Sequence, residues 1–436
     1  MTQIEQLGSR AKAASRFLAA LSAGKKIDGL HAIAQTLEEH KDEILRANGQ
    51  DMLAAKENGM KESMLDRLML DEKRIASMAQ AVRDVAKLED PIGETLHGFI
   101  APNGMNIRKV RVPLGVIGII YEARPNVTPD AASLCLKSSN AVILKGGKEA
   151  IESNRCMVNL MRQALEACGI PADAVQLIED TSRESTRELM KCNRYVDILI
   201  PRGGAGLIQS VVQNATVPVI ETGTGNCHIY IDKDADLAMG VEILYNAKTS
   251  RPSVCNAAES LLVHKDVAEA FLPLAKQRLD EMQVEWRGCE RVRKILGNSV
   301  LPATEEDYGT EFLDFILSAK VVDSLDQAIE HITRYGTGHS EAIVTQNLRA
   351  SEEFTSRVDA AAVYVNASTR FTDGGEFGLG AEIGISTQKL HARGPMGLKE
   401  MTTKKYKTNG GEQFRSPPAV KEREYGRKAR TAQGAP

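Results

Sequence analysis

The stretch ILIPRGGAGLIQSVV, residues 198–212, indicates the fold class of this chain. The apolar run at 198–200 is typical of a buried strand, and the residues from 205 onward have the pattern of a helix. Gly203, Gly204 and Gly206 stand between them, where glycines let a backbone approach a pyrophosphate at a helix N-terminus. The spacing is not the full GxGxxG fingerprint, so a plain tight turn remains open on this stretch alone.

The same alternation continues on both sides of this stretch. Strand-like apolar runs occur at 110–121, 141–145, 175–179, 196–200 and 217–221, with helical patterns near 128–139, 149–168, 183–192 and 205–214. A second series of apolar runs follows at 260–264, 315–323, 341–345 and 361–366. Buried strands that alternate with helices predict two α/β units with parallel sheets.

Other regions fit neither unit. Helical periodicity predicts helices over 7–22, 27–47 and 64–88. A Pro-Asn-Gly turn predicts a hairpin over 98–112, and 398–410 has the pattern of a late, exposed strand. Residues 411–436, rich in Pro, Gly and charge, are expected to be disordered.

The composition excludes several classes of protein. At 436 residues the chain is expected to form two or three domains, and a net charge of −3 gives no broad attraction to nucleic acid or anionic membranes. No apolar run approaches a membrane span, and the N-terminal residues lack the apolar core of a signal peptide. The seven cysteines form no CxxC pair and no short-spaced framework, which disfavours a zinc site. Their odd number and the lack of an export signal favour reduced thiols in the cytoplasm.

Two lysines follow a predicted strand in NAVILKGGKEA, residues 140–150. An acidic residue near such a strand end holds the ribose 2′-hydroxyl of NAD, whereas a basic residue accommodates the 2′-phosphate of NADP. Lys145 and Lys148, with no carboxylate before Glu149, therefore favour NADP(H). A solvated surface pair is the alternative.

Cys255 lies among small and polar residues in TSRPSVCNAAES, residues 249–260. A free cysteine is more often a small buried residue than a nucleophile. Here Lys248 and Arg251 lie just upstream and could favour the thiolate, and the cysteine is expected on a loop that enters a strand.

Several longer stretches together resemble the aldehyde dehydrogenase superfamily over about residues 5–410. They are VPLGVIGIIYEARPNVTPDAA, NAVILKGGKEA, IPRGG, VIETGTGNCHIYID, RPSVCNAAES and GAEIGISTQKLHARGPMGL. The closest resemblance is to the branch that reduces gamma-glutamyl phosphate in proline biosynthesis. The fold implied is a Rossmann-type cofactor domain, an α/β catalytic domain and a β-strand oligomerisation arm.

The resemblance also implies roles for individual residues. Cys255 matches the thiol nucleophile and Asn126 the asparagine that stabilises the oxyanion. The cofactor residues implied are Lys145, Lys148, Gly203, Gly204, Glu221 and, by a loose match, Glu311. Glu221 stands where hydrolytic relatives place a general base, a role that a phosphate-releasing reductase does not require.

A substrate with a carboxylate and a phosphate needs cations to bind it. Arg124 and Arg251 are the best placed by sequence, with Arg370 and His391 as weaker candidates, because guanidinium groups pair well with both anions. For each arginine, a loop cap or an ion pair with a surface acid is an equal alternative. His228 is expected to be structural.

The reaction implied is reduction of L-glutamyl 5-phosphate by NADPH through a thioester on Cys255, giving L-glutamate 5-semialdehyde and phosphate. The domains implied are 1–97 with 112–228 for the cofactor, 229–390 for catalysis, and 98–111 with 391–410 for an arm that joins a dimer or tetramer. A separate glutamate 5-kinase is expected to supply the substrate. The alternatives are a hydrolytic or coenzyme A-acylating aldehyde dehydrogenase, and a catalytically silent binding protein on the same fold.

Overall fold

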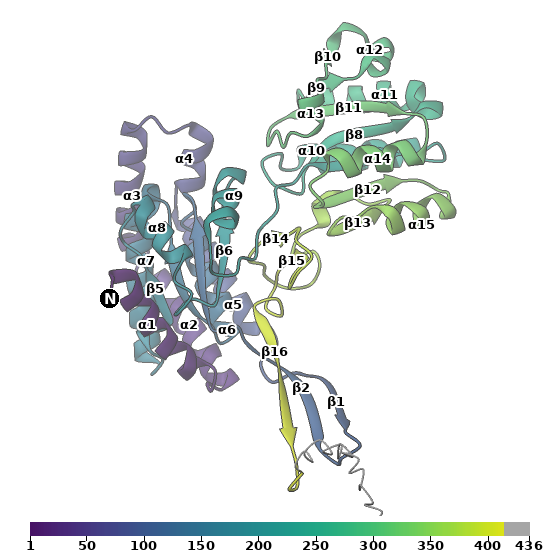
Figure 1. Ribbon diagram of the computed structural model, residues 1–436. Coiled ribbons are helices and arrows are strands. Elements are labelled where there is room, and N and C mark those ends of the chain that lie inside the picture. The colour runs from purple at the N-terminus through teal and green to yellow at the C-terminus, as the bar shows by residue number, and fades with distance from the viewer. Residues whose placement is uncertain (414–436) are drawn as a thin grey trace, which may run out of the picture.

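The chain forms two α/β lobes and a slender three-stranded arm (Figure 1). The computed structural model describes residues 1–413, so the predicted disordered tail lies outside the described residues from position 414 on. The arm leaves the region between the lobes and points away from both. Among residues 1–413, none of the helices combines the length and the apolar content that a membrane span requires.

The first lobe contains a four-stranded parallel sheet in the order β5-β4-β3-β6. Its strands are β3 (Val116–Tyr121), β4 (Ala141–Lys145), β5 (Val175–Leu177) and β6 (Ile198–Arg202). The helices between and after them are α6 (Val127–Lys137), α7 (Ile151–Ala167), α8 (Arg183–Met190) and α9 (Ala205–Asn214). The strands are buried along almost their whole length, which explains their continuous apolar runs.

Five helices precede this sheet: α1 (Gln3–Leu18), α2 (Ala23–Glu39), α3 (Lys41–Glu57), α4 (Glu62–Leu68) and α5 (Glu72–Lys87). Two of the three predicted helices are therefore each divided in two. The predicted helix 27–47 breaks at His40, which leaves the helical region with φ −106° and ψ 24°. The predicted helix 64–88 breaks at Asp71, which is extended and accepts the N–H of Arg74 as the N-cap of α5.

The predicted strand at 217–221 is wrong as a named strand. The segment makes only an isolated parallel bridge, between Leu199 and Val219. Pro218, the second residue of the segment, has no N–H to donate to a ladder, so pairing does not extend along the segment.

The second lobe contains a seven-stranded sheet in the order β10-β9-β11-β8-β7-β12-β13, in which every pairing is parallel. Its strands are β7 (Cys227–Ile231), β8 (Ala258–His264), β9 (Glu285–Gly288), β10 (Leu301–Pro302), β11 (Ile316–Val322), β12 (Ser340–Val344) and β13 (Ala362–Val365). Its helices are α10 (Leu237–Thr249), α11 (Lys265–Asp280), α12 (Glu290–Leu296), α13 (Glu305–Tyr308), α14 (Leu325–Tyr335) and α15 (Leu348–Arg357). The sequence did not predict β7, β9 and β10 as strands.

The arm is an antiparallel sheet in the order β1-β2-β16. It joins the predicted hairpin, β1 (Thr95–Ile100) and β2 (Asn106–Pro113), to the late strand β16 (Thr402–Asn409). Every residue of β1 is exposed, as are seven of the eight residues of β16. Two further short strands, β14 (Ile385–Ser386) and β15 (Gly394–Pro395), pair with each other in the segment that leads to β16.

Candidate active site

A cavity of about 370 Å³ contains Cys255 and is lined by both lobes. The first lobe contributes Glu122, which follows β3, and Gly203, which follows β6. The second lobe contributes Thr224, which precedes β7, and Cys255, which precedes β8. The cavity therefore lies at the carboxyl ends of the first sheet, where wound sheets hold ligands, and at the entry to the second. We call it the Cys255 cavity.

The surroundings of the Cys255 thiol favour its protonated form. Burial raises its pKa to about 11, and the nearby carboxylate of Glu311 acts in the same direction. The guanidinium of Arg202 opposes them, because it favours the thiolate. Arg202 is therefore the cation in this cavity that is best placed to activate the thiol.

The loop that carries Cys255 is held from several sides. The thiol of Cys227 donates to the carbonyl oxygen of Cys255 at 3.2 Å. The amide of Asn256 donates to the carbonyl oxygens of Arg370 and Thr372, and the hydroxyl of Thr369 donates to the carbonyl oxygen of Asn256 at 2.8 Å. These contacts fix the backbone of the nucleophile before any ligand arrives.

Five arginines line the Cys255 cavity: Arg67, Arg124, Arg202, Arg251 and Arg370. Among residues 1–413, none of these five guanidinium groups forms an ion pair. Burial lowers the pKa of Arg124, and the charges of Arg202 and Arg67 add to that effect. The group is therefore a concentration of positive charge that an anionic ligand would relieve.

Four carboxylates line the same cavity: Glu122, Glu311, Asp373 and Glu382. Each accepts a backbone N–H from a glycine, at 3.1 Å from Gly204, 2.7 Å from Gly225, 2.8 Å from Gly375 and 2.9 Å from Gly374 respectively. The acids thus stabilise the loops of the cavity, and the arginines stay available to a ligand.

Asn126 is exposed at the N-cap position of α6 and lines the Cys255 cavity. Its Nδ2 donates to Oδ2 of Asp130 at 3.3 Å. Burial raises the pKa of Asp130 to about 6. Since an amide nitrogen has two hydrogens, Asn126 can hold this contact and still donate to a ligand.

Seven of the ten site residues predicted from sequence line the Cys255 cavity: Cys255, Asn126, Arg124, Arg251, Gly203, Gly204 and Glu311. Lys145, Lys148 and Glu221 do not. Lys145 ends β4 and is buried, which lowers its pKa. Lys148 is exposed and lines a separate cavity of about 700 Å³ beside α3. Glu221 is half-buried, and its N–H donates to the Gln388 side chain.

Two weaker candidates differ in their location. Arg370 lines the Cys255 cavity, where Nε donates to the hydroxyl of Ser250 at 3.1 Å and Nη1 contacts Oδ1 of Asn256. His391 lies outside this cavity and is exposed, with Nε2 close to the carbonyl oxygen of Glu400.

Sequence reasoning missed these charged residues of the cavity: Glu122, Arg202, Arg67, Asp373 and Glu382. Arg202 could have been found, because it stands at a predicted strand end directly before the glycine turn. Arg67 gave no such signal, since it lies on α4, far from Cys255 along the chain.

Lys248 does not support the thiolate in the way the sequence suggested. It is fully buried, and its Nζ lies 2.6 Å from Oε2 of Glu259, which is also fully buried. Burial lowers the pKa of Lys248 and raises that of Glu259 to about 7. The other oxygen of Glu259 accepts the N–H of Leu313, a residue that lines the Cys255 cavity. The pair therefore stabilises a cavity loop.

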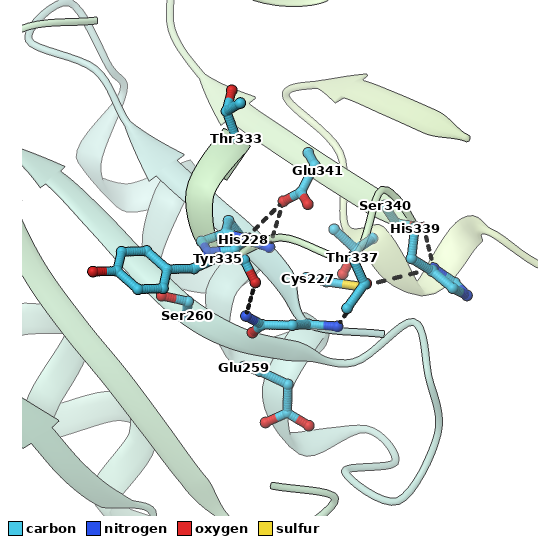
Figure 2. A network of polar contacts seen from close by, with 12 residues as sticks. Cys227, His228, Glu259, Ser260, Thr333, Tyr335, Thr337, His339, Ser340 and Glu341 are labelled. Carbon is cyan, nitrogen blue, oxygen red and sulfur yellow. Dashed lines mark hydrogen bonds and ion pairs between the residues drawn. The ribbon is translucent and has the colours of Figure 1, made fainter. Parts of the chain in front are cut away.

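A buried polar network surrounds β7 and β12 and includes Cys227, whose thiol contacts the Cys255 carbonyl (Figure 2). His228 directs its N–H and Nδ1 toward Oε2 of Glu341, at 2.8 and 3.0 Å. Asn226 donates to the carbonyl oxygens of Tyr308 and Tyr335. His228 is fully buried and does not line the Cys255 cavity, as expected for a structural residue.

Comparison with known proteins identifies the family. The model of the aldehyde dehydrogenase family matches residues 1–291. Gamma-glutamyl phosphate reductase of Clostridium perfringens (strain 13 / Type A) is 62% identical over 408 residues, which cover 94% of this chain and 98% of that protein. The enzyme of the same name from Heliobacterium modesticaldum is 59% identical over 414 residues, 95% of this chain and 99% of that protein.

Solved structures agree with the sequence comparison. A crystal structure of gamma-glutamyl phosphate reductase from Thermotoga maritima superposes with a TM-score of 0.93 at 49% identity, covering 95% of this chain and all of that chain. An acetylating aldehyde dehydrogenase from Geobacillus thermoglucosidasius, with a TM-score of 0.67, 18% identity and coverage of 95% of this chain and 98% of that chain, shares the fold. This chain belongs to the aldehyde dehydrogenase family and, within it, to the gamma-glutamyl phosphate reductases.

Proposed function

We propose that this chain reduces L-glutamyl 5-phosphate to L-glutamate 5-semialdehyde and phosphate with NADPH, the second step of proline biosynthesis from glutamate. One observation carries the proposal. Cys255 shares a cavity with Asn126 and with five arginines that have no acidic partner among residues 1–413. A thiol nucleophile, an amide donor and unpaired guanidinium groups suit a doubly anionic acyl substrate.

The first step forms a thioester on Cys255. Its sulfur bonds to the acyl carbon, and the carbonyl oxygen becomes an oxyanion that Asn126 Nδ2 and the backbone N–H of Cys255 can stabilise. The carbon–oxygen bond to phosphate then breaks. Phosphate leaves as hydrogen phosphate. The proton that it takes up balances the one that the thiol loses. Arg202 has two roles in this step, because its charge favours both the thiolate and the phosphate.

The residues of the first lobe fit a dinucleotide. Gly203 and Gly204 follow β6, and no side chain caps the N-terminus of α9. The N–H of Gly204 already binds a carboxylate, that of Glu122, so it is directed toward an anion. Lys145 and Lys148 would hold the adenosine ribose and its 2′-phosphate, and Glu221 and Glu311 would lie near the remainder of the cofactor. When bound, the cofactor supplies the hydride that reduces the thioester.

The reverse reaction tests this function, because the acyl phosphate is labile. Pyrroline-5-carboxylate, which forms from the semialdehyde, is supplied with NADP⁺, and NADPH formation is followed with and without inorganic phosphate. Strict phosphate dependence that is lost in Cys255→Ala is the expected result. Turnover without phosphate would overturn the proposal, because water would then resolve the thioester and Glu221 would regain the role of general base. Dependence on coenzyme A in place of phosphate would indicate an acylating dehydrogenase.

The two lobes and the arm have different roles. Residues 1–97 and 112–228 bind the cofactor, 229–390 carry out catalysis, and 98–111 with 391–410 join a second copy in a dimer or tetramer. The outer edges of β1 and β16 are unpaired among the described residues and could pair with that copy.

A glutamate 5-kinase would be the functional partner that supplies the labile substrate. All seven cysteines are free, which fits the reducing conditions of the cytoplasm.

A further inference from the structure

A second cavity of about 430 Å³ adjoins the Cys255 cavity, and we call it the α4 cavity. The two cavities share Arg67, Arg124, Asn126, Arg251, Ser253 and Val254. Beyond these shared residues the α4 cavity is lined by Asp130 of α6 and by α4, α5 and the turn between them, which contribute the ion pair Asp66–Arg74 and the apolar side chains Met69, Leu70, Met78 and Ala81. It can therefore receive the part of a substrate that extends away from the reacting carbon.

Arg67 is the shared residue that comes from α4. It is half-buried, and the polar contact of its guanidinium among residues 1–413 is a long one, 3.9 Å from Nη1 to the sulfur of Met64. The acid next to it in sequence, Asp66, is bound instead by Arg74, at 2.7 Å. Arg67 thus faces the cavities without an acidic partner.

The packing of α4 fixes the position of Arg67. Leu68 is fully buried against Ala123 and Ala150, beside the loop that carries Arg124. Asn48 donates to the carbonyl oxygen of Leu68 at 2.9 Å and accepts the N–H of Leu70 at 2.8 Å, so it holds the end of α4. The helix that carries Arg67 is therefore held against the first lobe at its C-terminal end.

The arginines divide between the two cavities. Arg202 and Arg370 line the Cys255 cavity alone, and the charge of Arg202 favours the Cys255 thiolate. Arg67 lines both cavities and comes from α4, the helix that borders the α4 cavity. The phosphate of an acyl group at Cys255 would occupy arginines of the Cys255 cavity. The carboxylate at the far end of the same carbon chain needs a cation that also faces the α4 cavity.

We propose that Arg67 binds the α-carboxylate of the amino-acid substrate and makes the enzyme selective for acyl groups with a carboxylate at their far end. The proposal rests on the proposed function, because it assumes that the acyl carbon lies at Cys255. The methylene groups of the substrate would then lie along the apolar side chains of the α4 cavity. An arginine fork that pairs with a carboxylate supplies both charge and geometry.

The test uses three aldehydes in the phosphate-dependent oxidation. Pyrroline-5-carboxylate supplies the amino and carboxylate groups, 5-oxopentanoate keeps the carboxylate alone, and pentanal has neither. In Arg67→Gln we expect kcat/KM to fall about 10- to 100-fold for the first two, mainly through KM, and to stay unchanged for pentanal. Arg67→Lys should keep part of the activity. Lys61→Gln removes an exposed charge beside α4 that lines neither cavity, and it should leave all three substrates unchanged.

A second measurement needs no turnover. Glutarate and inorganic phosphate should each slow alkylation of Cys255 by iodoacetamide in the wild type. Arg67→Gln should weaken protection by glutarate about 10- to 100-fold and leave protection by phosphate unchanged. An equal loss for both ligands, an equal fall for the three aldehydes, or no change at all would overturn the proposal. A wild type without phosphate-dependent oxidation of pyrroline-5-carboxylate would instead overturn the proposed function.

Discussion

Gly225 lies so close to Cys255 that a methyl group on Gly225 would stand 1.4 Å from the carbonyl oxygen of Cys255. That separation is much shorter than a van der Waals contact. The atom that the methyl group would meet belongs to the backbone, so it cannot move away by a side-chain rotation. The glycine-rich turn and the nucleophile loop are therefore in direct contact, and the side chain of Glu311 accepts the N–H of the same glycine.

The first prediction is that Gly225→Ala displaces the Cys255 loop. Since misplacement of a reacting group by about 1 Å costs roughly 100-fold in rate, we expect kcat/KM to fall by at least that factor. Gly49→Ala is the matched control, because Gly49 lies in α3 and a methyl group there meets nothing within 4 Å. Steady-state kinetics and thermal unfolding of both variants test this, and a fully active Gly225→Ala would contradict the packing described.

The second prediction concerns the ionisation of Cys255. Because its pKa is about 11, the rate of alkylation by iodoacetamide should rise about tenfold per pH unit between pH 7 and 10. Arg202 lowers this pKa, so Arg202→Gln should raise it and slow alkylation at a given pH. Glu311 raises it, so Glu311→Gln should speed alkylation. Mass spectrometry of the modified peptide, with Cys255→Ala as the blank, gives the rates, and a flat profile over this range would contradict the prediction.

The third prediction concerns the buried pair Lys248–Glu259. Removing one partner leaves a buried charge without its counter-ion, so Lys248→Met should lower the free energy of unfolding by about 3–5 kcal/mol. The double variant Lys248→Met/Glu259→Gln should lose less, because the glutamine is neutral and can still accept the N–H of Leu313. Urea unfolding of Lys248→Met, Glu259→Gln and the double variant measures the coupling, and losses that simply add would show that the charges do not interact.

The sequence predicted most of the buried strands but missed the central strand β7, in which His228 interrupts the apolar run, and it predicted the edge of the second sheet poorly. The predicted run 141–145 coincides with β4, because a strand covered on both faces carries a continuous apolar signal. In β9 only Trp286 is a large apolar residue, so this short strand near the edge gives neither a run nor an alternation. The helix breaks at His40 and Asp71 were missed because apolar periodicity continues across them.

The candidate site shows the same division. The loops around Cys255 and Gly203 were predicted, because each has a local pattern that resembles a known family. Arg67 was not, because its place beside Arg124 depends on the packing of α4 against Ala123. That contact joins segments far apart in the chain, which no local pattern records.

The last prediction tests the choice of cofactor. Lys148 is exposed at the start of a short helix after β4, and three acids line the cavity beside it: Asp51, Glu149 and Glu152. Asp51 is occupied, because its carboxylate accepts the backbone N–H groups of Glu152 and Ser153 at the start of α7. Glu152 is paired with Arg155, so Lys148 has to outweigh Glu149 if a 2′-phosphate is to bind.

Lys148→Glu should weaken NADPH binding about 10- to 100-fold and leave NADH binding within about threefold, because only NADPH carries the 2′-phosphate. Titration of the fluorescence of each reduced cofactor measures both affinities without turnover. Lys191→Glu makes the same charge change at an exposed residue that lines neither the Cys255 cavity nor the cavity beside α3, and it should affect neither affinity. An equal loss of affinity for both cofactors in Lys148→Glu would mean that Lys148 contacts a part of the molecule that NADPH and NADH share. No loss of affinity for either would mean that Lys148 does not contact the cofactor.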